Sequence, residues 1–309
     1  MVLSRRVLNG AKVTTRSSHT KVTPTAGGIV IVAATVAGTI ANHAIMGYND
    51  WLVLAGGLLL ATVSFMDDLH PLPPLPRLIV QIVAVSASFW WLCYPEAAFL
   101  YVAVVFGGVA FVNGLNFLDG ICGMLGMYSA VLIGSLWFAF TYLAPECPES
   151  QLYTNLCVWM LIGIAAFMAF NIRDVIFSGD TGSVFMGFVA GVILANLIIS
   201  TRSMYFLVFV SVCFCDTGLT TFHRLLSGKN IFRPHKCFIY QRLVAYWHLP
   251  HLAVSMIYAV LQLVIDAVFF CIPDSYRTVY LVAVVLALSL AYAVLRYYSS
   301  ESTRRAPAK

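Results

Sequence analysis

The sequence predicts an all-α protein: a polytopic transmembrane helical bundle of about ten spans, with both termini in the cytoplasm. Three observations lead to this fold class. Of the 309 residues, 61% are hydrophobic and 10% are charged, whereas soluble proteins average about 25% charged residues. Apolar runs recur that are long enough to cross a hydrocarbon core of ~30 Å at a rise of ~1.5 Å per residue. The basic residues gather in alternate connecting segments, as they do in membrane proteins.

The predicted spans are the ten apolar runs, each set off from the next by a polar segment. The second and eighth runs are short, so their ends are predicted only to within several residues. Together the runs make one integral membrane domain over residues 1–309, without a visible internal repeat or a soluble second domain. In chain order the runs cover residues 27–47, 51–66, 78–94, 97–113, 123–144, 153–170, 182–200, 204–215, 250–271 and 278–296.

The orientation follows from the positive-inside rule. An even number of spans puts both termini on one side, and 16 of the 18 Lys and Arg residues then fall on that side, with Arg202 and Arg277 opposite. The cytoplasmic parts are the N-terminal segment 1–26, the long loop 216–248 and the tail 297–309. Residues 1–26 are polar and basic, without the apolar core of a cleavable signal peptide. The net charge of +5 therefore reflects topology, and no nucleic-acid partner is expected.

Carboxylates at the cytoplasmic ends of the runs are the first sign of function, because an acidic residue at membrane depth needs a partner, a water-filled cavity or a role. Four segments, "SFMDDLHPL", "NGLNFLDGICG", "FSGDTGSVF" and "CFCDTGLTTFHRLL", bring them to one face of the membrane. Helix capping is the alternative for Asp180, which precedes Thr181 and Gly182 at the start of a span. Capping explains the pair Asp67 and Asp68 poorly, since adjacent negative charges at a helix C-terminus oppose the helix dipole.

A cation is the natural compensation for these charges. Oxygen ligands from several loops suit Mg²⁺, which keeps water molecules and shares its coordination sphere with substrate phosphates. The stretch "HTKVTPTAGGIV" adds Lys21, two threonine hydroxyls and the backbone amides of Gly27 and Gly28 before a helix, a position that favours anions. "RPHKCFIYQRL" adds basic residues on the long inner loop, although a solvated loop that only sets topology is the alternative for that stretch. Together these features predict a Mg²⁺-diphosphate substrate.

Five ordered motifs resemble those of the polyprenyl-phosphate N-acetylhexosamine-1-phosphate transferases. They are "RSSH…KVTPTAGG", "FMDDL…R", "NGLNFLDGICG", "FSGDTGSVFMG" and "RPHKCFIYQRL", and they extend over about residues 16–245. Within this family the chain is most similar to the bacterial enzymes that initiate O-antigen or related surface polysaccharides, a branch of glycosyltransferase family 4 that shares the "RSSH" and "YQRL" elements. It resembles the phospho-N-acetylmuramoyl-pentapeptide translocase less, because that enzyme has a histidine-rich stretch in place of "HKCFIYQ".

The resemblance implies an enzyme of the bacterial inner membrane whose active site faces the cytoplasm. Such an enzyme transfers a sugar 1-phosphate of the N-acetylhexosamine type from a UDP-sugar to undecaprenyl phosphate and releases UMP. The product would start an O-antigen-like polysaccharide of the cell envelope, as in lipopolysaccharide biosynthesis. Mg²⁺ is the implied cofactor, with Mn²⁺ as a substitute, and the lipid bilayer is the implied surrounding. The identity of the sugar and the oligomeric state, a homodimer included, stay open.

The resemblance also implies roles for single residues. Asp180 and Asn116 are expected to ligate the metal, while Asp67 and Asp68 organise or deprotonate the attacking lipid phosphate. His235 joins the catalytic group through a phosphate contact. The substrate-binding residues, among which Asp119 holds its loop or the nucleotide, are Lys21, Thr25, Asn116, Asp119, Cys122, Arg233 and Lys236.

Three features depart from the family pattern. Family members carry a further span ahead of the "RSSH" stretch. They commonly have Asp or Asn, which contact the nucleobase side of the donor, where this chain has Cys122, a weak hydrogen-bond partner; packing beneath the loop is the alternative role for this side chain. Phe238 stands where close relatives carry a second histidine. Two other classes of function therefore stay open: a catalytically silent relative that acts as a membrane scaffold, and a transporter, for which only Asp266 lies within a predicted span.

Overall fold

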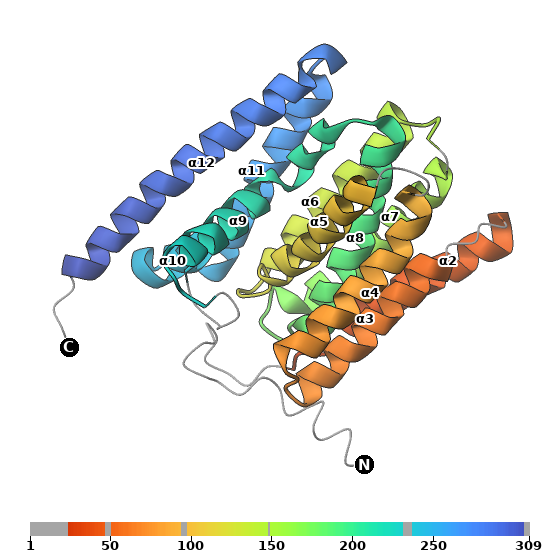
Figure 1. Ribbon diagram of the computed structural model, residues 1–309. Helices are drawn as coiled ribbons and strands as arrows, with labels where there is room; N and C mark the ends of the chain where they lie inside the picture. Colours follow the sequence, from red (N-terminus) through yellow and green to blue (C-terminus); the bar gives the residue numbers. More distant parts are fainter. Residues whose placement is uncertain (1–23, 47–50, 94–97, 148, 231–236, 306–309) are drawn as a thin grey trace.

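The computed structural model describes residues 24–46, 51–93, 98–147, 149–230 and 237–305. All regular structure in these ranges is helical, which confirms the predicted all-α class (Figure 1). η1 is a π-helical turn that continues α6, and η2 is a 3₁₀-helix that leads into α9. The described elements are α2 (Gly28–Met46), α3 (Trp51–Leu69), α4 (Pro74–Cys93), α5 (Ala98–Asn116), α6 (Met124–Phe138), η1 (Ala139–Leu143), α7 (Ser150–Asn171), α8 (Gly179–Thr201), η2 (Met204–Val210), α9 (Ser211–Leu226), α10 (Ile239–Trp247), α11 (His251–Cys271) and α12 (Asp274–Arg305).

The ten predicted apolar runs all lie on helices of the described chain. Seven of these helical stretches are long and apolar enough to cross a membrane, and three shorter apolar ones, Gly28–His43, Pro74–Trp90 and Tyr101–Asn116, account for the other runs. The chain is therefore a multi-helix membrane protein. The number of helices that cross the bilayer and the side on which the termini lie stay predictions. The seven longer stretches are Trp51–Leu69, Met124–Leu143, Ser150–Asn171, Gly179–Thr201, Met204–Leu226, His251–Cys271 and Asp274–Ser299.

Helix α8 is the centre of the bundle, because it packs against α2, α3, α4, α5, α6 and η2 and is buried over most of its length. Its glycines permit this crowding. An added Cβ on Gly182 would meet the α-carbon of Gly28 on α2, and one on Gly187 would lie 3.1 Å from the α-carbon of Val112 on α5. By contrast, α12 lies at the edge of the molecule and contacts α9, α10, α11 and η2 (Figure 1).

The segment 216–248, predicted as a loop, is largely helical in the described part of the chain. Helix α9 continues to Leu226, and α10 begins at Ile239. The reason is Asp216, a buried residue of α9 whose carboxylate accepts hydrogen bonds from the backbone N–H groups of Ile239 (2.7 Å) and Tyr240 (3.2 Å) and from the Tyr258 hydroxyl (2.7 Å). Asp216 thus caps the first turn of α10 and ties it to α9 and α11.

A buried polar network compensates the break between η2 and α9. The amide nitrogen of Gln262 donates to the carbonyl oxygen of Val208 (2.8 Å), and its amide oxygen accepts from the backbone N–H of Val212 (3.1 Å). Asp266, one helical turn along α11, accepts from Gln262 (2.7 Å) and from the Ser135 hydroxyl (2.6 Å). Backbone groups in an apolar environment must be satisfied internally. Asp266 therefore stabilises the contact between α6 and α11. This role explains an acidic residue within a predicted span, so Asp266 is no sign of a transport pathway.

The contact between Gly28 and Gly182 gives a first test of the fold. Gly28→Ala should lower the thermal stability, because the added methyl group collides with the Gly182 backbone, which cannot rotate away. Overpacking of this kind typically costs about 1–3 kcal/mol. Gly218→Ala in α9 is the matched control, since an added Cβ there meets nothing within 4 Å. Thermal unfolding in detergent compares the two variants, and equal melting temperatures would contradict the close approach of α2 and α8.

The predicted orientation can be tested with cysteines at opposite ends of the bundle. Cys147 precedes α7 and Cys271 ends α11, whereas Cys237 precedes α10. In variants that retain a single cysteine, a membrane-impermeant thiol reagent should label Cys147 and Cys271 from outside sealed cells. It should label Cys237 only after permeabilisation. Labelling of Cys237 in sealed cells would invert the predicted topology.

Candidate active site

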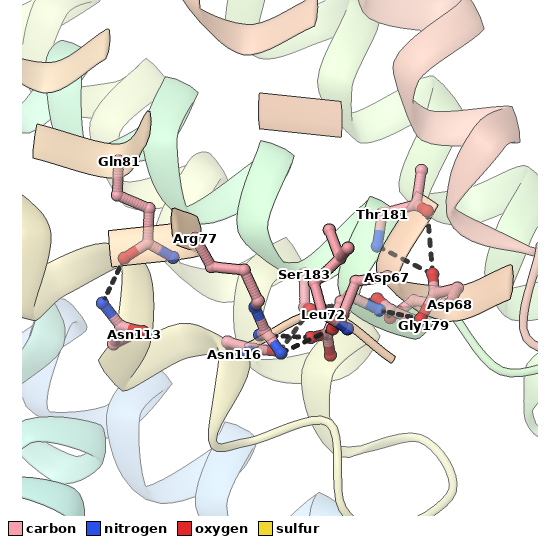
Figure 2. A network of polar contacts seen from close by, with 12 residues as sticks. Asp67, Asp68, Leu72, Arg77, Gln81, Asn113, Asn116, Gly179, Thr181 and Ser183 are labelled. Atoms are coloured by element: carbon pink, nitrogen blue, oxygen red, sulfur yellow. Dashed lines mark hydrogen bonds and ion pairs between the residues drawn. The ribbon is translucent and has the colours of Figure 1, made fainter. Parts of the chain in front are cut away.

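Two carboxylates from different helices converge on one guanidinium group at the end of the bundle where α3 ends and α4 and α8 begin (Figure 2). Arg77, in the first turn of α4, bonds through Nη1 to Asp67 Oδ2 at the end of α3 and through Nη2 to Asp180 Oδ2 in the first turn of α8, both at 2.5 Å. The side chain of Asp67 is 10% exposed and that of Asp180 is 29% exposed. The predicted residues Asp67 and Asp180 are therefore brought together by Arg77, the arginine of the motif "FMDDL…R", which was not among the predicted site residues.

Asp68 caps the start of α8 from a neighbouring helix. Its Oδ1 accepts from the backbone N–H of Asp180 (3.2 Å), and its Oδ2 accepts from the backbone N–H (3.2 Å) and the hydroxyl (2.8 Å) of Thr181. Ser178, which precedes the helix, makes no side-chain cap of its own. Both oxygens of Asp68 are thus engaged by the first turn of α8. In the structure this carboxylate fixes the helix turn that carries Asp180. That Asp68 organises or deprotonates the lipid phosphate stays a prediction.

The segment around Thr25 lies against the loop before α8. Gly27 donates its backbone N–H to Phe177 O (2.9 Å), and Gly28 donates to Ser178 O (3.1 Å). The prediction that these two amides bind a phosphate is therefore wrong, because both are used to join α2 to the start of α8. Gly179 completes the junction with a φ of 65°, a left-handed conformation that favours glycine. A side chain at Gly179 would also collide with the carbonyl oxygen of Thr25.

The end of α5 adds a row of amide side chains to the site. Asn116 Oδ1 accepts from the Ser183 hydroxyl of α8 (2.6 Å), and Asn113 Nδ2 donates to Gln81 Oε1 of α4 (2.7 Å) (Figure 2). The network therefore links α3, α4, α5 and α8. Sequence reasoning found Asn116 but missed Gln81, Asn113 and Ser183. Helical spacing was the available signal, since residues three or four apart share a helix face, as Arg77 and Gln81 do.

Asp119 lies in the loop between α5 and α6, beside the same cluster. It accepts a hydrogen bond from the Ser178 hydroxyl (2.6 Å). Burial above all, and then the negative charges of Asp180 and Asp68, raise the pKa of the Asp119 carboxyl to about 7. The site thus gathers four carboxylates, whereas Arg77 is the one Lys or Arg side chain that contacts them in the described part of the chain.

Helix α10 holds the loop that carries Asp119. The Tyr240 hydroxyl donates to the carbonyl oxygen of Phe117 (2.6 Å) and covers Gly120, where a Cβ would collide with that hydroxyl. Phe238 packs on Phe117 with ring centroids 5.4 Å apart and stacks on Tyr240 at 5.9 Å. Phe238, which stands in place of a histidine, therefore anchors the loop through packing.

Cys122 is buried, with 3% of its surface exposed, and its thiol donates to the carbonyl oxygen of Asn171 (2.7 Å). Burial raises the pKa of the thiol to about 12, so the group stays a donor. The Asn171 side chain in turn accepts from the backbone N–H of Gly123 (2.9 Å). Cys122 is therefore packed beneath the loop, and a contact with the nucleobase stays a prediction. Four of the predicted site residues, Lys21, Arg233, His235 and Lys236, lie outside the described residues.

The donor set fits a hard divalent cation. The carboxylates of Asp67 and Asp180 already converge on one positive group, and Asn116 Oδ1 accepts from Ser183, one helical turn after Asp180 on α8. Within the described ranges, no group of three or more His, Cys, Asp or Glu side chains is arranged to hold a metal ion. Two carboxylates and an amide oxygen are nevertheless suited to Mg²⁺, because this ion commonly keeps several waters and takes one or two carboxylates together with substrate phosphates.

Comparison with known protein families connects this geometry to an enzyme class. Residues 51–198, which extend from the start of α3 to near the end of α8 and include the four carboxylates of the site, match the family model described as glycosyl transferase family 4. The resemblance inferred from the sequence motifs is thereby confirmed. Members of this family are phosphotransferases that transfer a hexosamine 1-phosphate to a polyprenyl phosphate.

The individual relatives have low sequence identity to this chain, but each match covers most of it. The probable undecaprenyl-phosphate N-acetylglucosaminyl 1-phosphate transferase of Bacillus subtilis (strain 168) is 23% identical over 79% of this chain and 72% of its own length. The decaprenyl-phosphate N-acetylglucosaminephosphotransferase of Mycobacterium leprae (strain TN) is 25% identical over 83% of this chain and 75% of its own length. A phospho-N-acetylmuramoyl-pentapeptide-transferase of Thermotoga neapolitana is 24% identical over 67% of this chain and 70% of its own length.

The buried position of Cys122 makes a prediction about two substitutions. Cys122→Ser should keep the free energy of unfolding within ~1 kcal/mol of the wild-type value, because the hydroxyl can donate to the same carbonyl of Asn171. Cys122→Asp should lower it by about 2 kcal/mol or more, because a carboxylate beside a carbonyl oxygen is buried without a donor. Thermal unfolding in detergent measures both. A Cys122→Asp variant that is as stable as the wild type and binds UDP-sugar more tightly would restore the nucleobase role.

Proposed function

Taking the match to glycosyl transferase family 4 as the premise, we propose that this protein transfers an N-acetylhexosamine 1-phosphate from a UDP-sugar to undecaprenyl phosphate. In this reaction a phosphate oxygen of the acceptor forms a bond to the β-phosphorus of the donor. The bond between that phosphorus and the oxygen that bridges the two phosphates breaks, and UMP leaves. The observation that carries the proposal is the convergence of carboxylates from α3 and α8 on a single guanidinium, with Asp119 of the α5–α6 loop bonded to Ser178 directly before α8.

The chemistry needs positioning and charge neutralisation more than covalent help. When bound, Mg²⁺ would neutralise the diphosphate and stabilise the leaving phosphate. Asp180 and Asn116 would hold it, with Asp67 beside them. Asp67 keeps its place because its Oδ1 accepts from the backbone N–H of Leu72 (2.6 Å). Asp68 acts through the first turn of α8, and its two engaged oxygens leave Asp67 as the carboxylate that faces the acceptor phosphate.

The remaining phosphate contacts are proposed from the family pattern. Lys21, Arg233, His235 and Lys236 lie in two segments that flank the described site in sequence, and their basic character suits a diphosphate. Thr25 is next to the start of α8 and is proposed as a further polar contact. We place this site on the cytoplasmic face of the inner membrane, where a nucleotide-sugar donor is available.

We propose N-acetylglucosamine as the first sugar to test. The relatives from Bacillus subtilis and Mycobacterium leprae are named for N-acetylglucosamine transfer, while a relative from Thermotoga neapolitana is named for a phospho-N-acetylmuramoyl-pentapeptide. The "RSSH" and "YQRL" elements favour an enzyme that initiates an O-antigen-like polysaccharide. The cell-envelope pathway is therefore proposed from the sequence motifs and the sugar from the relatives.

A direct assay tests the proposal. Purified protein with undecaprenyl phosphate, Mg²⁺ and a panel of UDP-N-acetylhexosamines should release UMP, and EDTA should abolish the release. Asp180→Asn should lower turnover by at least about a hundredfold, because it removes one charge at the proposed metal site; this corresponds to a barrier increase of about 2.7 kcal/mol. Asp274→Asn, at the start of α12 on the opposite end of the bundle, is the matched control.

The assay also tests the metal assignment and the scaffold alternative. Turnover of the Asp180→Asn variant within about threefold of wild type would contradict the metal assignment. A folded wild-type protein that releases no UMP from any donor in the panel would contradict the transferase and favour the membrane scaffold.

A further inference from the structure

We infer that Arg77 occupies the cation position of this site in the metal-free protein and must release Asp180 before a divalent cation can bind. The inference rests on the proposed function, because that function supplies the metal. It assigns Arg77 a positioning role: an internal counter-ion that holds the two carboxylates close together until the metal binds.

The first support is the geometry of the guanidinium. A planar fork has two terminal nitrogens, and here each one takes a different carboxylate, Asp67 from α3 and Asp180 from α8. An arginine that merely strengthened one helix contact would normally pair both nitrogens with one carboxylate, the bidentate arrangement that fits best. Bridging two acids from two helices is the task that a metal ion performs in a carboxylate site.

The second support is that both acids have anchors other than Arg77. The carboxylate of Asp67 is held because its Oδ1 accepts from the backbone N–H of Leu72 at 2.6 Å. The backbone of Asp180 is held because its N–H donates to Asp68. Arg77 can therefore leave Asp180 while the Asp67 carboxylate and the Asp180 backbone keep their positions.

The third support is the exposure of the contact. The Arg77 side chain is 28% exposed and that of Asp180 is 29% exposed. Ion pairs exposed to this degree are weak, because water and salt screen them. A doubly charged cation with the same two acids within reach competes well against such a contact. The released guanidinium then lies beside the metal position, where a substrate phosphate can accept from its fork.

A Mn²⁺ titration without substrate tests the competition. Free Mn²⁺, counted by electron paramagnetic resonance, gives the affinity of wild type, Arg77→Gln and Arg77→Lys in detergent. Arg77→Gln should bind Mn²⁺ about tenfold more tightly than wild type, because a competing positive charge is removed. The Mn²⁺ affinity of Arg77→Lys should lie between those of wild type and Arg77→Gln, because an ammonium keeps the charge but lacks the planar fork. Arg277→Gln, which breaks the 3.1 Å pair with Asp274 at the other end of the bundle, should match wild type.

A second measurement uses the wild-type chain alone. Phenylglyoxal modifies free guanidinium groups, and mass spectrometry can follow Arg77 and Arg277 in one sample. Mg²⁺ should raise the modification rate of Arg77 severalfold and leave that of Arg277 unchanged. The inference is overturned if a folded Arg77→Gln variant binds Mn²⁺ no more tightly than wild type, or if Mg²⁺ leaves the Arg77 rate unchanged. Both readouts omit the donor and the acceptor, so UMP release by the wild type tests the proposed function separately.

Discussion

Concentrated negative charge in a chain with few charged residues is the constraint on which the rest of this structure depends. Four aspartates lie within one cluster, and only Arg77 contacts them as a cation in the described part of the chain. Three devices make the cluster tolerable. The N-terminus of α8 offers its first amides to Asp68, so that the helix dipole opposes the charge. Arg77 bridges two of the acids. Asp119 has a pKa raised towards neutrality, so that it is partly uncharged.

The capping of one helix by an acid of another helix occurs at two places in the molecule. Asp68 caps α8 from α3, and Asp216 caps α10 from α9. In both cases an acid of one helix completes the first turn of another, which ties two segments together and satisfies amides that water would otherwise reach. The second cap places Tyr240 and Phe238 over the loop of Asp119. The two caps thus position the two sides of the candidate site, one through α8 and the other through α10.

The fold could be predicted from the sequence because long apolar runs have few alternatives to a membrane helix. The aspartates of the site could be found because they interrupt or end those runs. The contacts that Arg77, Gln81 and Ser183 make could not, since their partners lie on other helices. The capping roles of Asp68 and Asp216 depend on which helices are neighbours. The segment 216–248 was predicted as a loop because its polarity was taken for solvation, whereas its acid is buried in a helix–helix junction.

The cap on α8 also has a consequence for how the protein is made. Asp68 and Thr181 are separated by 113 positions, so a growing chain exposes Asp67, Asp68 and Arg77 long before their partner exists. During that interval α3 and α4 have a paired acid and base, which makes their ends easier to hold in the membrane than two unmatched acids would be. Synthesis of α8 then supplies the amides that donate to Asp68 and completes the junction. The candidate site is therefore complete only after α8 has been made.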